Sequence, residues 1–148
     1  MTSHAATAAL AALLLLQPAR AGAQWVPTGA LAAVPVVHDC HETGGDVAAT
    51  RLDPPTIYLC PLVVRLIRKK DPGAEHFYLV HEYGHVALAT ADEAAADCWA
   101  ARALAQAPRG RRYLALAVEH FRGRPHQESA RYGTPAERAL RLQRCAGD

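Results

Sequence analysis

The chain has 148 residues, of which 51% are apolar and 20% charged, a size and composition that suit one compact domain and exclude a disordered or low-complexity protein. Its 16 Lys and Arg residues nearly balance its 14 Asp and Glu residues, so the formal net charge is only +2. Such a weak field does not favour nucleic acid or an anionic membrane over other partners, and we expect neither as a partner.

The first 23 residues have the layout of a secretory signal peptide. Residues 5–16 are apolar except for Thr7, and the small residues Ala21 and Ala23 follow. The apolar run is too short to span a bilayer as a helix. We expect cleavage after Ala23 and a secreted or periplasmic domain over residues 24–148. The alternative is a retained anchor or a buried N-terminal helix.

The next segments predict little β-structure. Residues 24–55 are rich in proline and glycine, which indicates a loop with at most one strand, at the β-favouring stretch 34–38. A better strand is predicted over residues 56–60, between prolines on both sides. Pro61 suits the first position of a following helix, which Asp71, Pro72 and Gly73 end.

The rest of the chain predicts helices. They cover residues 74–89, 93–107 and 111–121, and a last helix opens at Pro135 with Thr134 as its N-cap. The expected fold class is therefore α+β, mainly α with a small β element, in one domain.

Four cysteines occur in the chain, at Cys40, Cys60, Cys98 and Cys145. In an exported protein an even number predicts disulfides, and four cysteines allow three pairings. No spacing is Cys-x-x-Cys, so a four-cysteine zinc site is not expected. We favour Cys40 with Cys60 and Cys98 with Cys145, because the second bond would tie the C-terminal segment to the central helices.

His81, Glu82 and His85 form an HExxH segment inside the predicted helix 74–89. Two histidines four residues apart lie near one face of a helix, so both imidazoles can bind one metal ion. Glu82 then lies beside the open position of the metal, where it can take a proton from water. For this segment alone, the alternative is a solvated helix face that carries two histidines.

Glu93 and Asp97 follow a break in the helical pattern. If the chain reverses around residue 89 into an antiparallel helix pair, Glu93 lies beside His85 as a third ligand. Asp97 then lies beside His81 and can accept its free imidazole N–H. Two histidines and one carboxylate leave one position of a tetrahedral zinc ion for water, which is typical of catalytic zinc. Alone, the two acids could be ordinary residues of a first helical turn.

Together the two segments resemble the HExxH and Glu-x-x-Ala-Asp signature of gluzincin-type zinc metallopeptidases, particularly small exported bacterial ones. The resemblance covers roughly residues 75–105 and implies a minimal zincin-like fold in which a helix pair carries the metal. It implies His81, His85 and Glu93 as zinc ligands, Glu82 as general base and Asp97 as the partner of His81. It also implies that the strand at 56–60 runs along the cleft and pairs with an extended peptide substrate.

A peptidase of this kind commonly needs a further donor to the oxyanion of its tetrahedral intermediate. The candidates are Tyr132, His126 and His120, and spacing does not choose among them, although we rank Tyr132 and His126 ahead of His120. Residues 38–42 could hold a second metal ion, but a polar loop around a disulfide is the preferred interpretation.

We therefore expect an exported zinc metallopeptidase that hydrolyses peptide bonds and takes a peptide or protein as substrate. One alternative is a disulfide-stapled binding or inhibitor module with a structural zinc site and no catalysis. Another is a helical adaptor that needs no metal. Metal content separates the adaptor from the rest, and the effect of Glu82→Gln on turnover separates the enzyme from the module.

Overall fold

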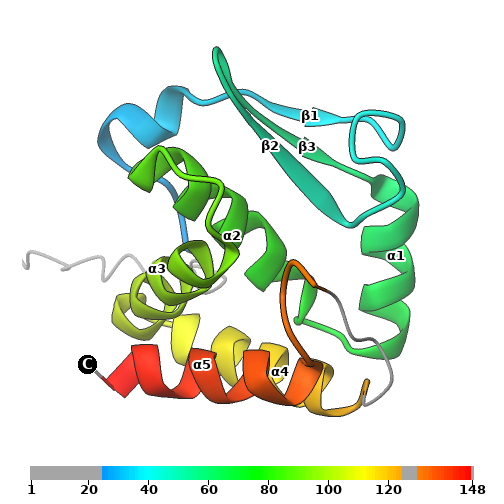
Figure 1. Cartoon of the computed structure of the whole chain (residues 1–148), viewed down its shortest axis with the longest axis vertical. Helices are drawn as coiled ribbons and strands as arrows, with labels where there is room; N and C mark the ends of the chain where they lie inside the picture. The colour runs from blue at the N-terminus through cyan, green and yellow to red at the C-terminus, as the bar shows by residue number, and fades with distance from the viewer. Residues whose placement is uncertain (1–24, 125–129, 148) are drawn as a thin grey trace, which may run out of the picture.

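Residues 25–124 and 130–147 are described by a computed structural model, shown in Figure 1. Its elements in chain order are a 3-10 helix η1 (Gly29–Ala33), the strands β1 (Val36–His38), β2 (Ala48–Leu52) and β3 (Pro55–Leu59), and the helices α1 (Pro61–Lys70), α2 (Glu75–Leu88), α3 (Glu93–Gln106), α4 (Gly110–Arg122) and α5 (Pro135–Gly147). The α+β class is confirmed. The predicted signal peptide lies outside the described residues.

The strands form a mixed sheet in the order β1-β3-β2. β1 pairs with β3 in parallel and β2 pairs with β3 in antiparallel register, with Thr50 opposite Ile57. β3 is therefore the central strand, and both of its edges are occupied. The expectation that the strand at 56–60 pairs with a substrate is thus wrong, because within residues 25–124 and 130–147 the unpaired edges of this sheet belong to β1 and β2.

β2 is a strand that the sequence does not predict. Its residues, Ala48 to Leu52, lack a run of β-branched or aromatic side chains, which are the usual strand signal. The strand forms because Gly44 and Gly45, with φ values of 62° and 90°, turn the chain back toward β3. Its buried end then lies against α2.

α2 is the central helix of the molecule and lies between the sheet and the α3, α4 and α5 helices (Figure 1). It ends at Ala89, which takes a left-handed φ of 47°, and the N–H of Thr90 donates to the carbonyl of His85 at 3.1 Å. α3 begins after Asp92, whose carboxylate accepts from the N–H groups of Ala94 and Ala95. The predicted reversal near residue 89 is confirmed.

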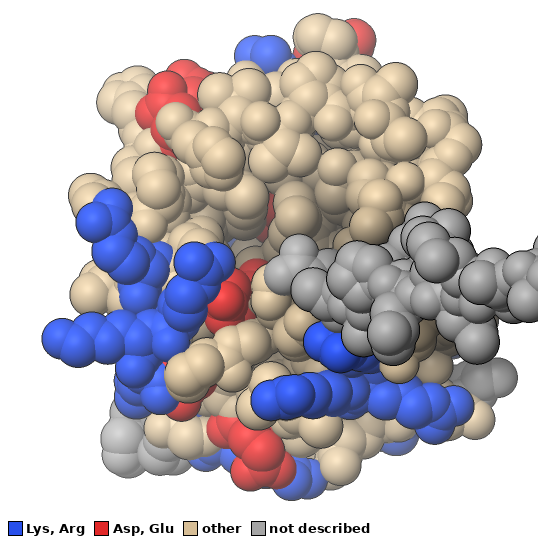
Figure 2. Space-filling view, turned by 180° about the vertical axis from the view of Figure 1, so that it is seen from behind, with Lys and Arg blue, Asp and Glu red and all other residues tan. Residues whose placement is uncertain are grey.

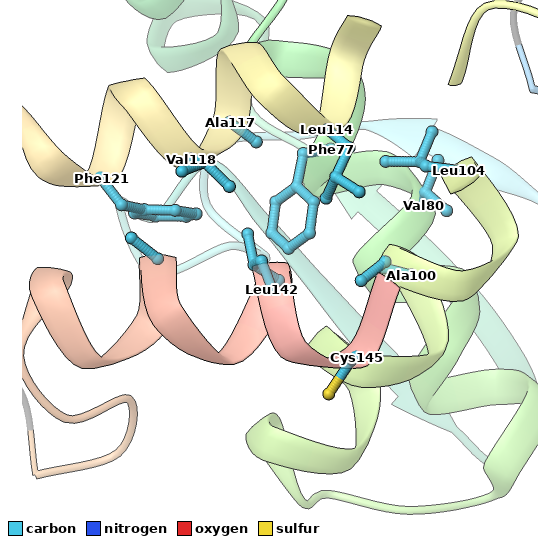
Figure 3. Close-up of a cluster of buried hydrophobic side chains, with 12 residues drawn as sticks. Phe77, Val80, Ala100, Leu104, Leu114, Ala117, Val118, Phe121, Leu142 and Cys145 are labelled. Atoms are coloured by element: carbon cyan, nitrogen blue, oxygen red, sulfur yellow. The ribbon is translucent and has the colours of Figure 1, made fainter. Parts of the chain in front are cut away.

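The hydrophobic core lies among α2, α3, α4 and α5 (Figure 3). Phe77 of α2 is fully buried and meets Leu104 of α3, Phe121 of α4 and Leu142 of α5 in one cluster. Both favoured disulfides are present: Cys40–Cys60 joins the loop after β1 to the start of α1, and Cys98–Cys145 joins α3 to α5. The core therefore holds α2 and α3 side by side.

The outer face of α1 is basic. Arg65, Arg68, Lys69 and Lys70 are all exposed, and the Lys and Arg side chains at the left of Figure 2 lie on the side where Figure 1 places α1. Arg68 donates to Glu75 at 2.7 Å, so part of this charge is neutralised. Within the described ranges, none of the helices has both the length and the apolar character needed to cross a membrane.

Candidate metal site

His81, His85 and Glu93 converge at the contact between α2 and α3. Nε2 of His81 lies 3.1 Å from Nε2 of His85, and Oε2 of Glu93 lies 2.9 Å from the first and 3.3 Å from the second. All three side chains are buried, and their ligand atoms lie within 4.8 Å of one another. Glu93 thus contacts both histidines rather than His85 alone. Among the described residues no second such group occurs, and residues 38–42 do not form one.

The outer nitrogen of each imidazole already faces an acceptor. His81 Nδ1 lies 2.9 Å from Oδ1 of Asp97, and His85 Nδ1 lies 2.8 Å from the carbonyl oxygen of Thr90. These acceptors place the proton of each neutral imidazole on Nδ1, which leaves both Nε2 lone pairs directed at one point together with the Glu93 carboxylate. Three groups therefore direct lone pairs at one point, and none of them directs an N–H or O–H there. Two imidazole nitrogens and one carboxylate are ligands that suit zinc.

The charges of the cluster also favour a cation. Burial lowers the pKa of His81, but its hydrogen bonds with Asp97 and Glu93 raise it more, so the pKa lies above its ordinary value. Burial raises the pKa of Glu93, but hydrogen bonds with the two imidazoles outweigh it and hold that pKa well below its usual range. Both shifts show that the cluster stabilises positive charge beside an ionised Glu93, as a cation site does.

Asp97 is held in place by two arginines of α5. Its carboxylate is fully buried and accepts from Arg138 Nη2 at 2.8 Å and from Arg141 Nη1 at 2.8 Å. The Arg138 guanidinium lies over the ring of Phe121 at 4.4 Å and that of Tyr132 at 4.5 Å. The expected contact of Asp97 with His81 is confirmed, but the sequence did not reveal either arginine.

Glu82 lies next to the cluster, in the wall of a cleft of about 560 Å³. Its side chain is buried, and the hydroxyl of Thr50 in β2 donates to its Oε2 at 2.7 Å. Thr50 was missed because no strand is predicted at this position. The cleft wall also includes residues from the start of β2, from α1, α2, the end of α4 and the segment 131–135.

Of the candidate oxyanion donors, Tyr132 lines the cleft and His120 does not. Tyr132 lies in the cleft wall with its ring 6.3 Å from that of His81, and burial raises the pKa of Tyr132 to about 12, which keeps its hydroxyl protonated. His120 is buried outside the cleft wall, with both ring nitrogens hydrogen-bonded. His126 lies outside the described residues.

The segment that carries Tyr132 also touches the third candidate ligand. Arg131 Nε forms an ion pair with Oε1 of Glu93, although the Arg131 side chain is 60% exposed. In Figure 1 this segment is the orange loop that rises from the start of α5 toward α2. The loop before α5 therefore forms one side of the site.

Comparison of the chain with protein-family models, with curated proteins and with solved structures found no match.

Proposed function

We propose that the protein is an exported zinc-dependent metallopeptidase of the gluzincin type. The observation that carries the proposal is the convergence of His81, His85 and Glu93 on one point, with His81 and the adjacent Glu82 in the wall of a cleft. Export is supported by the signal-like N-terminal sequence and by two disulfides, which persist in oxidising compartments.

The chemistry follows from the donor set. Zinc held by these three residues would supply Lewis acidity, which polarises a scissile carbonyl and lowers the pKa of water. Glu82 would take the proton of the attacking water and deliver it to the leaving amine. The Thr50 hydroxyl fixes the rotamer of the Glu82 carboxylate for that transfer. Tyr132 would donate its O–H to the oxyanion, with His126 as the second candidate.

An extended peptide would lie in the cleft between α2 and the loop before α5. β2 is better suited than β3 to pair with such a peptide, because no strand of the described part of the chain occupies its outer edge and it packs on α2. The cleft volume of about 560 Å³ suits a few substrate side chains rather than a folded domain.

The test begins with the metal. We expect about one zinc ion per chain in the purified protein by elemental analysis, and peptide cleavage that a chelator abolishes. Glu82→Gln should retain zinc and lose turnover, whereas Glu119→Gln, an exposed acid on α4, should change neither. Zinc retained with an activity indifferent to Glu82→Gln would favour the binding or inhibitor module. A zinc-free protein whose His81→Ala variant folds identically would defeat both.

A further inference from the structure

Tyr78, His120 and Asp71 are joined by hydrogen bonds, and the first of them, Tyr78, lines the cleft. The Tyr78 hydroxyl oxygen lies 2.9 Å from Nε2 of His120, and Nδ1 of His120 lies 2.7 Å from Oδ2 of Asp71. Tyr78 lines the cleft, three residues before His81 and four before Glu82 on α2, so it lies one helical turn from both on the same face. His120 and Asp71 are not part of the cleft wall.

The hydrogen-bond partners of His120 determine which of its ring nitrogens carries the proton. The Asp71 carboxylate can only accept, so the proton of a neutral His120 lies on Nδ1 and Nε2 keeps its lone pair. Nε2 then accepts from Tyr78, which commits the phenolic proton to His120. Burial lowers the pKa of His120, although its hydrogen bond with Asp71 opposes this, and burial raises the pKa of Tyr78, so both groups are neutral at neutral pH.

A hydroxyl whose proton is already donated can offer only its oxygen lone pairs to a ligand. We propose that the Tyr78 hydroxyl oxygen binds a backbone N–H of the peptide in the cleft, with His120 and Asp71 as positioning residues that keep the Tyr78 proton turned away. The inference rests on the proposed function, because it takes the occupant of the cleft to be a peptide. It makes Tyr78 a specificity-determining residue that rejects a substrate lacking that N–H, such as one with proline there.

The first test reads the proton on His120 and needs no activity. Long-range ¹H–¹⁵N correlation spectra at pH 7.5 distinguish the two neutral imidazole tautomers, and His120→Gln identifies the signals that belong to His120. We expect a proton on Nδ1 and none on Nε2. A proton on Nε2 would overturn the proposal, because the hydroxyl would then accept from His120 and keep its own proton for the cleft.

The second test asks whether Tyr78 contacts a peptide N–H. Peptides are selected from a random library for binding to the zinc-loaded Glu82→Gln protein, and each backbone amide of a selected peptide is then N-methylated in turn. At one position we expect N-methylation to weaken binding about 3- to 10-fold through the lost hydrogen bond. In the Glu82→Gln/Tyr78→Phe protein that penalty should disappear, since the acceptor is gone.

Tyr113→Phe is the matched control. It removes the same atom from a tyrosine of α4 whose ring packs on His76, 4.2 Å away between ring centroids, and which is not in the cleft wall. It should preserve the N-methylation penalty.

The outcomes separate this inference from the proposed function. If the Tyr78→Phe change alters the penalty at no position, the inference is wrong whether or not the wild-type protein cleaves peptides. If Tyr78→Phe removes the N-methylation penalty but the wild-type protein cleaves no peptide, the inference stands and the proposed function fails. A library from which no peptide is retained would overturn both.

Discussion

Gly84 of α2 lies against the backbone of Ala96 in α3. A Cβ atom built on Gly84 would lie 2.9 Å from the carbonyl oxygen of Ala96 and 3.1 Å from its Cα, so no larger residue fits at position 84 without a backbone shift. This contact lies between the turns that carry His81 and His85 on one helix and Glu93 and Asp97 on the other. The small residue inside the HExxH segment therefore sets the spacing of the candidate ligands.

Gly84→Ala should lower both the stability and the zinc affinity of the protein. Alanine is the better helix former by about 1 kcal/mol, but overpacking against the Ala96 backbone costs about 1–3 kcal/mol and pushes α3 away from the histidines. Urea unfolding and a zinc competition assay measure the two effects. Gly147→Ala, at the end of α5 with no neighbour within 4 Å of the added atom, is the control. A Gly84→Ala protein as stable as the control would contradict the close contact.

Asp97→Asn should be among the most damaging single changes in the chain. It removes the charge that compensates Arg138 and Arg141 in a fully buried position, which costs about 3–5 kcal/mol. It also weakens the contact that orients His81, for which a 10- to 100-fold loss of zinc affinity is expected. Chemical denaturation and zinc titration test both. Asp92→Asn keeps the helix cap and should cost little; equal losses in the two variants would refute the special role of Asp97.

The candidate ligands could be predicted because their geometry is local. A spacing of four residues on one helix and a short reversal fix where His81, His85, Glu93 and Asp97 lie, and no distant part of the chain is needed. The α5 helix and its capping residue were predictable for the same reason: the Thr134 hydroxyl accepts from the N–H of Glu137 at 3.2 Å.

The groups that support the ligands come from far along the chain and carry no local signal. Arg138 lies 41 residues after Asp97, to which it donates a hydrogen bond. The sequence pattern predicts only that Arg138 is an exposed residue of an amphipathic helix. Thr50 lies 32 residues before the Glu82 that it contacts, on a strand whose own residues lack a β-favouring run. Such contacts depend on tertiary packing, which periodicity and spacing do not encode.

His120 should make part of the stability depend on pH. Because burial lowers its pKa below the ordinary 6.5, the unfolded chain takes up a proton before the folded protein does as the pH falls. The contribution of neutral His120 is therefore fully present above about pH 6.5 and is lost as the pH falls toward the folded pKa. Free energies of unfolding of the wild type and of His120→Gln, measured from pH 7.5 to 5, should converge on acidification. A constant difference would show that His120 does not titrate in this way.

Thr50→Val should impair catalysis while leaving the fold and the metal intact. Valine has nearly the shape of threonine but cannot donate to Oε2 of Glu82, so the general base loses the contact that fixes its rotamer. A hydrogen bond to a charged group contributes about 1.5–3 kcal/mol, which corresponds to a fall in kcat/KM of about 10- to 100-fold. Thr56→Val is the matched control, because the Thr56 hydroxyl donates to the carbonyl of Pro54 in the turn before β3, 3.2 Å away, and accepts from Arg51 at 3.4 Å, without contacting Glu82. Zinc content should stay unchanged in both variants, and equal rates would show that Thr50 does not act through Glu82.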